Sequence, residues 1–292
     1  MSTVALLAIT GLGLGALYFL IAAGLSLIWG LMRVLNFAHG AFFTVGAYIG
    51  WTAGAATAGG PGAQWIVAAL VAVATGAVFA ALTEIVLIRP LYARHVGQVL
   101  VTVGLALATI ALIEGFYGSD PRKVVLPDWM AATTTLAGAV IPNTRLLAIA
   151  VAVLVLLALL FFLRRTRYGL IVRAGVENRA MVSALGIDVQ RAFTLVFAIG
   201  GMAAGLAGIL GAAYYGTIDP ARGTAMLIFA FIVVVIGGLG SIAGSALAAV
   251  IVGLLQQFLN FYAAAGTGDF AVVLLLAIVL LVRPGGIAGT AT

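Results

Sequence analysis

The residues of this chain that could do catalytic chemistry are few, and none falls in a catalytic spacing. Cysteine is absent, and neither histidine, His39 or His95, belongs to a metal-binding H-E-x-x-H pattern. The only lysine, Lys123, lies between Arg122 and Val124, so the chain contains no G-x-x-x-x-G-K-[ST] phosphate loop. The sequence therefore predicts no catalytic site and no cofactor or metal on this chain. If ATP drives it, another chain must bind the ATP.

The basic side chains cluster in one polar segment, residues 164–191, which lies between two long apolar runs. Only Glu177 and Asp188 oppose its charge there, against six arginines: Arg164, Arg165, Arg167, Arg173, Arg179 and Arg191. One interpretation is that these arginines hold the neighbouring spans in orientation, because short cytoplasmic loops carry an excess of Lys and Arg.

A second interpretation of this segment rests on the stretch VENRAMVSALGIDVQ. It is typical of a short helix with Met181, Val182 and Leu185 on one side, ended by Gly186 in the role of a C-terminal glycine. A short amphipathic helix projecting from a membrane domain offers a surface to a cytoplasmic partner. We favour partner docking, with the anchoring role as the alternative.

The composition indicates an integral membrane protein. The chain has 292 residues, of which 64% are hydrophobic and 8% charged, with a mean hydropathy of +1.27. Soluble domains are roughly half apolar and a quarter charged. Apolar runs long enough to cross a bilayer recur throughout, so we predict one all-α membrane domain, residues 1–292, with about eight to nine transmembrane segments. The formal charge of +6 lies mainly in loops, which argues against nucleic acid as a partner.

Several runs carry glycines at four-residue spacing, such as Gly46, Gly50 and Gly54, which predicts close helix packing. Three prolines predict a non-helical external loop over about 118–143. Residues 224–236 form a short run that breaks at GGLGSIAGS, which predicts a broken or re-entrant segment.

The break at GGLGSIAGS makes three of its residues candidates for a solute pathway: Gly237, Gly238 and Gly240. Irregular backbone at membrane depth is tolerated only where it is buried in protein or lines a water-filled cavity. Asn36 and His39 are further pathway candidates, because they lie among aromatic and small residues between two predicted helices. The alternative for that pair is that the side chains cap helix ends.

The two acidic residues within spans, Glu84 and Glu114, lie near span ends. We expect each to pair or to lie at the interface rather than to bind substrate, which counts against ion coupling. The charges of the loops place residues 164–191 in the cytoplasm together with Arg33, Arg89, Arg94 and Arg283, and hence the C-terminus. The N-terminus is then external if the broken segment crosses the membrane.

The stretches Gly11–Tyr48, Arg165–Phe193 and GGLGSIAGS together resemble the permease subunits of bacterial ABC importers for branched-chain amino acids. The stretch MRVLNFAHG is similar to one of the two paired permease types of this family. The basic loop is similar to the segment by which such permeases engage their ATPase, although it lacks a plain E-A-A triplet. The resemblance implies a coupling role for Glu177, Asn178, Gly186, Ile187 and Asp188.

The resemblance also implies an assembly in the bacterial inner membrane. Its expected parts are a second permease subunit forming a heterodimer, two cytoplasmic ATPase subunits that bind the ATP, and a periplasmic substrate-binding protein. The expected substrate is leucine, isoleucine, valine or a related amino acid. Two alternatives stay open: an ABC permease for urea, amides or sugars, and an ion-coupled carrier or channel that acts alone.

Overall fold

The apolar runs form helices, because in a bilayer every backbone N–H and C=O group must be paired within the protein. The computed structural model describes residues 2–177, 181–182, 186 and 188–288. Within these residues six helical stretches are long and apolar enough to cross a membrane: α1 (Ser2–Met32), α3 (Pro61–Leu82) with its continuation to Leu91, α4 (His95–Tyr117), α6 (Asn143–Arg165), α9 (Val189–Tyr215) and α11 (Ile242–Tyr262). The predicted helical membrane fold is confirmed, with short strands in the connections. A total of eight to nine segments remains a prediction.

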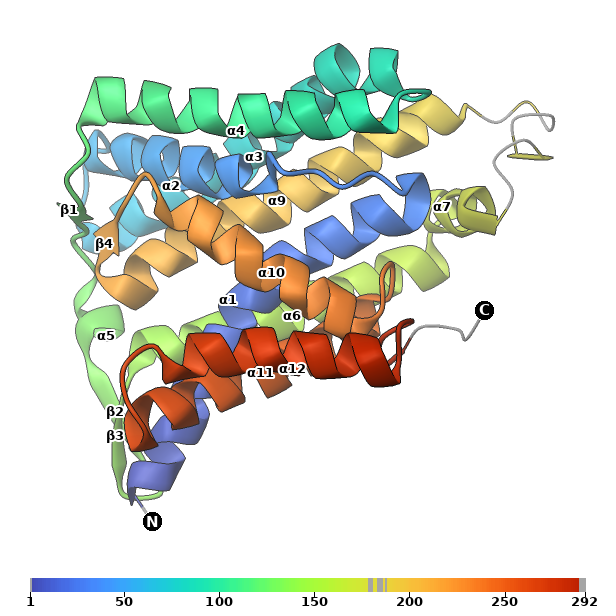
Figure 1. The fold of residues 1–292 in the computed structure, drawn as a ribbon. Helices are drawn as coiled ribbons and strands as arrows, with labels where there is room; N and C mark the ends of the chain where they lie inside the picture. The colour runs from blue at the N-terminus through green and yellow to red at the C-terminus, as the bar shows by residue number, and fades with distance from the viewer. Residues whose placement is uncertain (1, 178–180, 183–185, 187, 289–292) are drawn as a thin grey trace.

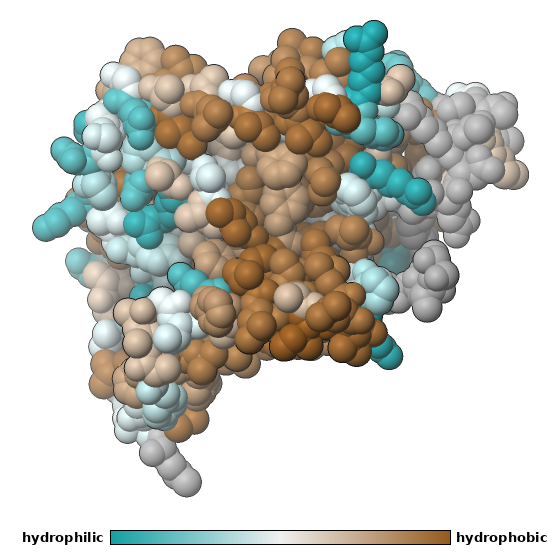
Figure 2. Space-filling view, viewed as in Figure 1, coloured by the Kyte–Doolittle hydropathy of each residue, from teal (hydrophilic) through white to brown (hydrophobic). Residues whose placement is uncertain are grey.

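Shorter helices lie beside these: α2 (His39–Ala55) and the apolar helices α10 (Arg222–Gly237) and α12 (Thr267–Val282). Figure 1 shows the helices packed lengthwise, with the N-terminus at one end of the bundle and the C-terminus and α7 (Arg167–Glu177) at the other. We call these the N-terminal end and the α7 end. In Figure 2 hydrophobic side chains cover the middle of the molecule and hydrophilic ones gather toward both ends, as expected of a protein that spans a bilayer.

The connection over residues 118–143 lies at the N-terminal end and is largely non-helical, as its prolines predict. It contains the one-turn helix α5 (Asp128–Ala131) and the hairpin of β2 (Thr133–Leu136) with β3 (Ala139–Pro142). It also contains β1 (Arg122–Lys123), which pairs antiparallel with β4 (Thr217–Ile218) beyond α9. This pairing joins the connection over residues 118–143 to the end of a central helix.

The core lies around α1 and α9. In the most apolar 18-residue stretch of each, 61% and 67% of the residues are buried, against 17% in α6. Glycines let the central helices approach: a Cβ added at Gly201 of α9 would lie 2.1 Å from the Gly76 carbonyl oxygen of α3, and one at Gly15 of α1 would lie 2.4 Å from the Ala249 oxygen of α11. The predicted close packing through small residues is therefore confirmed.

The predicted irregular stretch GGLGSIAGS is shorter than expected. α10 ends at Gly237 and α11 begins at Ile242, because the Ser241 side chain caps α11 by accepting a hydrogen bond from the Gly244 N–H at 3.0 Å. The prediction that residues up to Ser245 interrupt the helix was wrong. A longer interruption lies after α1, where Arg33 has φ +53° and the chain runs back along the bundle before α2 begins (Figure 1).

Candidate functional site

Asn36 lies in this interruption between α1 and α2, His39 is the first residue of α2, and both are fully buried. The Asn36 side chain accepts a hydrogen bond from the Ala38 N–H at 3.0 Å, which caps the turn leading into α2, while its Nδ2 has no partner among the described residues. The His39 ring packs edge to face on Phe42 and lies beside Gly24 of α1. Gly24 lies eight residues before the end of α1, which is roughly 12 Å of helix. The pair is therefore well inside the bundle.

Of the glycines predicted for the pathway, Gly237 ends α10, and Gly238 and Gly240 lie in the turn between α10 and α11, toward the α7 end (Figure 1). Gly238 and Gly240 have φ of +98° and +87°, which only glycine adopts without strain. The segment after α12 covers the end of α10, because the Ile287 N–H donates to the Ile236 carbonyl at 2.8 Å and the Ala288 N–H to the Gly237 carbonyl at 3.1 Å. The turn is thus held by the segment that follows α12.

The predicted coupling residues lie along the polar segment between α6 and α9. Glu177 is the last residue of α7, Gly186 has φ +76°, and Asn178 and Ile187 lie outside the described residues. Asp188 caps α9: its Oδ1 accepts hydrogen bonds from the backbone N–H groups of Gln190 and Arg191 at 3.1 and 3.2 Å.

The helix predicted within this segment is described only in part. Met181 and Val182 are helical, whereas Leu185 lies outside the described residues. Val182 is 4% exposed and belongs to the core, while Met181 is 63% exposed. Partner docking on this helix stays a prediction, as does the coupling role of Glu177, Asn178, Gly186, Ile187 and Asp188.

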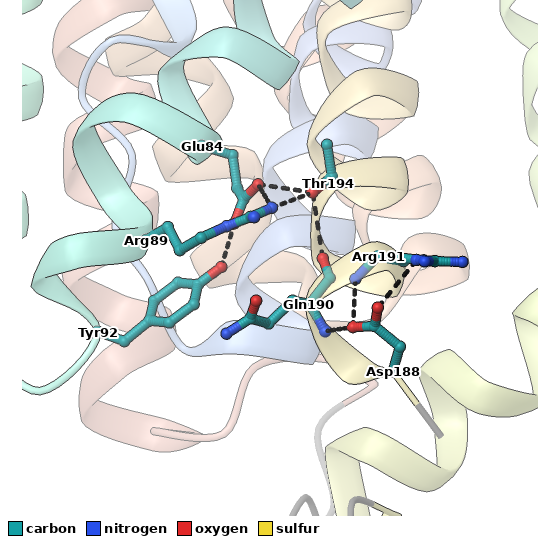
Figure 3. Close-up of polar contacts among 7 residues, drawn as sticks. All are labelled: Glu84, Arg89, Tyr92, Asp188, Gln190, Arg191 and Thr194. Atoms are coloured by element: carbon teal, nitrogen blue, oxygen red, sulfur yellow. Dashed lines mark hydrogen bonds and ion pairs between the residues drawn. The ribbon is translucent and has the colours of Figure 1, made fainter. Parts of the chain in front are cut away.

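A buried polar cluster lies at the start of α9, just beyond the basic loop (Figure 3). Glu84 is fully buried and forms an ion pair with Arg89 at 3.0 Å. Thr194 of α9 donates a hydrogen bond to Glu84 Oε2 at 2.7 Å and accepts one from Arg89 Nη2 at 2.8 Å. The Tyr92 hydroxyl donates to Glu84 Oε1. We call Glu84, Arg89, Tyr92 and Thr194 the Glu84 cluster. The predicted pairing role of Glu84 is confirmed, while its link to α9 was not foreseen.

The local backbone explains this pairing. Residues Thr83–Ile88 form a π-helical turn, η1, followed by a short 3₁₀ turn, η2 (Arg89–Leu91). A π turn places residue i+5 over residue i, so Arg89 lies over Glu84. Pro90 lacks an N–H and its ring clashes with the carbonyl of the preceding turn, which favours this change of helix type.

A polar cavity of about 460 Å³ lies toward the N-terminal end, among α1, α9, α10, α11 and α12. Its charged and hydrogen-bonding lining includes Tyr18, Tyr215, Asp219, Arg222, Gln256 and Asp269. The Tyr18 hydroxyl donates to Gln256 Oε1 at 2.7 Å, and Gln256 Nε2 donates to Asp269 Oδ1 at 2.5 Å. Sequence reasoning missed this site, since its members come from distant helices and share no local pattern. The only signal was that Asp219, Arg222 and Asp269 stand next to apolar runs.

These features define a multi-pass helical membrane protein with a basic loop and a polar cavity toward opposite ends. The family model "Branched-chain amino acid transport system / permease component" matches residues 7–283, and the chain belongs to this family. It is a transport permease subunit of an ABC importer and not an enzyme.

Curated relatives share almost the whole chain. The chain is 31% identical over 292 residues to the high-affinity branched-chain amino acid transport system permease protein LivH of Salmonella typhimurium, covering 96% of this chain and 93% of the relative. It is 30% identical to the corresponding protein BraD of Pseudomonas aeruginosa, covering 96% and 94%. A ribose import permease protein, RbsC of Escherichia coli, is 31% identical over 134 residues, covering 44% and 41%. No solved structure matches the chain.

Proposed function

We propose that this permease moves leucine, isoleucine, valine or a related amino acid across the bacterial inner membrane. The observation that carries the proposal is the full-length similarity to two permeases named for branched-chain amino acid transport. The similarity to a ribose permease, which covers 44% of the chain, makes sugar import the second candidate. The amino acid is favoured because the longer matches include the residues that line the polar cavity, Tyr18 and Asp269 among them.

The proposed assembly contains a second permease subunit, two cytoplasmic ATPases and a periplasmic substrate-binding protein. ATP binds to the ATPase subunits, since the only lysine here, Lys123, is not part of a phosphate loop. The α7 end faces the cytoplasm in this proposal. It carries Arg164 and Arg165 in the last turn of α6, and positive residues concentrate in cytoplasmic loops.

The basic loop receives the ATPase in this proposal, and Glu177, Gly186 and Asp188 contribute to the contact surface. Because Asp188 also caps α9, motion of the loop would pass directly into a central helix. The interruption at Asn36 and His39 and the turn at Gly237, Gly238 and Gly240 are proposed as points where the pathway can change shape. At each of these two places the regular helical hydrogen bonding is interrupted next to α1.

Co-purification and reconstitution test this function. The chain is tagged in its native host, extracted in mild detergent, and the co-purifying proteins are identified. The recovered complex is then placed in liposomes with the binding protein, and uptake of labelled leucine and labelled ribose is compared with and without ATP. We expect a second permease, two ATPases and ATP-dependent leucine uptake. Recovery of this chain alone with ATP-independent transport would contradict the ABC assignment, and uptake of ribose alone would favour the sugar.

Asp188 allows a sharper test of coupling. Asp188→Asn keeps a good N-cap but removes the charge, whereas Asp188→Ala removes both. If the charge contacts the ATPase, both variants lose leucine uptake per ATP hydrolysed. If only the cap matters, Asp188→Asn behaves as wild type. Unchanged coupling in both variants would contradict a role for Asp188.

A further inference from the structure

The polar cavity toward the N-terminal end holds opposite charges that are not fully used by the protein. Arg222 and Asp219 approach at 3.8 Å, which is too long for a hydrogen bond. Arg222 Nε is buried and has no hydrogen-bond partner in the described part of the chain. Yet the guanidinium is held in place, since its Cζ lies 4.2 Å from the centre of the Tyr215 ring. A fixed guanidinium with free donors is suited to bind a carboxylate.

Asp269 offers the complementary charge from α12. Gln256 Nε2 donates to its Oδ1, and Gln256 is itself fixed by the buried Tyr18 hydroxyl. An ionised carboxylate has about four acceptor sites, so this single hydrogen bond leaves capacity for a further donor. The carboxylate is therefore oriented by the protein and open to an ammonium group.

An apolar wall completes the cavity. Met226 and Phe229 of α10 line it, and Phe229 stacks on the Tyr18 ring with centroids 5.1 Å apart. The volume of about 460 Å³ falls in the range of small-molecule sites, roughly 300–1,000 Å³. A fitting ligand is small, carries one positive and one negative group, and has an aliphatic part.

We propose that this cavity binds a free α-amino acid, with its carboxylate on Arg222, its ammonium on Asp269 and its aliphatic side chain against Met226 and Phe229. The assignment rests on the proposed function and adds to it a binding station within the permease, separate from the periplasmic binding protein. A sugar has neither charge, so this station would discriminate against it by leaving both Arg222 and Asp269 without a ligand partner.

Because the chain has no cysteine, a single introduced thiol can report occupancy. Ala225→Cys places the thiol in the cavity lining, and Ser119→Cys is the control in the exposed external connection. The assembled complex, without binding protein, is labelled with a water-soluble thiol reagent at increasing L-leucine. By mass action, leucine at ten times its Kd should slow labelling of Ala225→Cys about tenfold and leave Ser119→Cys unchanged.

Two analogues test the orientation of the ligand. Leucinamide lacks the carboxylate and 4-methylpentanoate lacks the ammonium, so each should protect Ala225→Cys only at concentrations about tenfold or more above leucine. Added to the Ala225→Cys chain, Asp269→Asn and Arg222→Gln should each abolish protection by leucine. Equal protection by leucine and both analogues would overturn the two-charge assignment.

Uptake by the wild-type complex separates this proposal from the proposed function. If leucine is taken up but gives no protection, the cavity assignment is wrong and the function stands. If leucine protects but is not taken up, the station stands and the proposed function fails. If Ala225→Cys cannot be labelled even without leucine, a partner covers the cavity and the assignment is wrong.

Discussion

Two polar clusters toward opposite ends of the bundle use their charges in different ways. In the Glu84 cluster, the fully buried carboxylate accepts hydrogen bonds from Arg89, Tyr92 and Thr194. In the polar cavity the exposed carboxylate of Asp269 accepts from Gln256, and the guanidinium of Arg222 keeps a buried N–H unpaired. The first cluster is closed by the protein itself, whereas the second leaves groups for a ligand.

This difference follows from burial. A carboxylate without water must be paired and hydrogen-bonded, or its charge costs several kcal/mol. The Glu84 cluster meets that condition by joining the end of α3 to α9 just after the basic loop. The cavity contacts water through Asp269, so its charges can exchange water for a ligand. The Glu84 cluster positions helices, whereas the polar cavity binds a ligand in our proposal.

The largest expected effect is the loss of the buried carboxylate. Glu84→Ala leaves Arg89 and Thr194 without their common partner, and breaking a buried ion pair costs about 3–5 kcal/mol. Arg89 is 32% exposed, so we expect a value near the lower end, about 3 kcal/mol. The thermal unfolding midpoint of the purified complex should fall clearly. Glu114→Ala, at an exposed glutamate of α4, is the control and should leave the midpoint unchanged. Equal midpoints for both variants would show that the cluster is not structural.

The second effect should appear in transport instead of stability. Asp269→Asn keeps the size of the side chain and an acceptor for Gln256 but removes the charge, so the unfolding midpoint should stay near that of wild type. Leucine uptake should fall about tenfold or more, since the ammonium loses a charged partner. Uptake assays in liposomes alongside unfolding scans check this pair of results. A variant that loses stability and uptake in parallel would make Asp269 structural, which would remove the contrast with Glu84.

Local patterns predicted the helices well, because the length of each apolar run can be read directly from the sequence. The predicted apolar runs agree with helices such as α1 and α6, and glycines spaced by four marked the closely packed faces. Local patterns gave the wrong result where a single side chain decides the start of a helix. GGLGSIAGS contains four glycines, yet the Ser241 side chain caps a helix that begins inside this stretch. The interruption at Asn36, by contrast, agrees with the two helices predicted on either side of it.

The polar cavity could not be predicted from the sequence for a different reason. Tyr18 and Gln256 form a hydrogen bond across 238 residues, so only the packing of α1 on α11 brings them together. The Glu84 cluster could be predicted only in part from the sequence. A glutamate and an arginine five residues apart suggested a pair, but the π turn that aligns them and Thr194, which is 110 residues from Glu84, depend on tertiary structure.

The smallest effect isolates the contact between the Glu84 cluster and α9. Thr194→Val removes the hydroxyl at constant shape, while Glu84 keeps Arg89 and Tyr92, so the expected loss is about 1 kcal/mol. Thr194→Ser restores the hydroxyl and should recover most of it. In a double-mutant cycle, Thr194→Val should cost much less in a Glu84→Gln background, because contacting residues are not additive. It should cost the same in an Asp188→Ala background, since the side chain of Asp188 bonds to Gln190 and Arg191. Additivity with Glu84 would mean that the hydroxyl stabilises α9 only through its bond to the Gln190 carbonyl, and the closed cluster would then end at Arg89 and Tyr92.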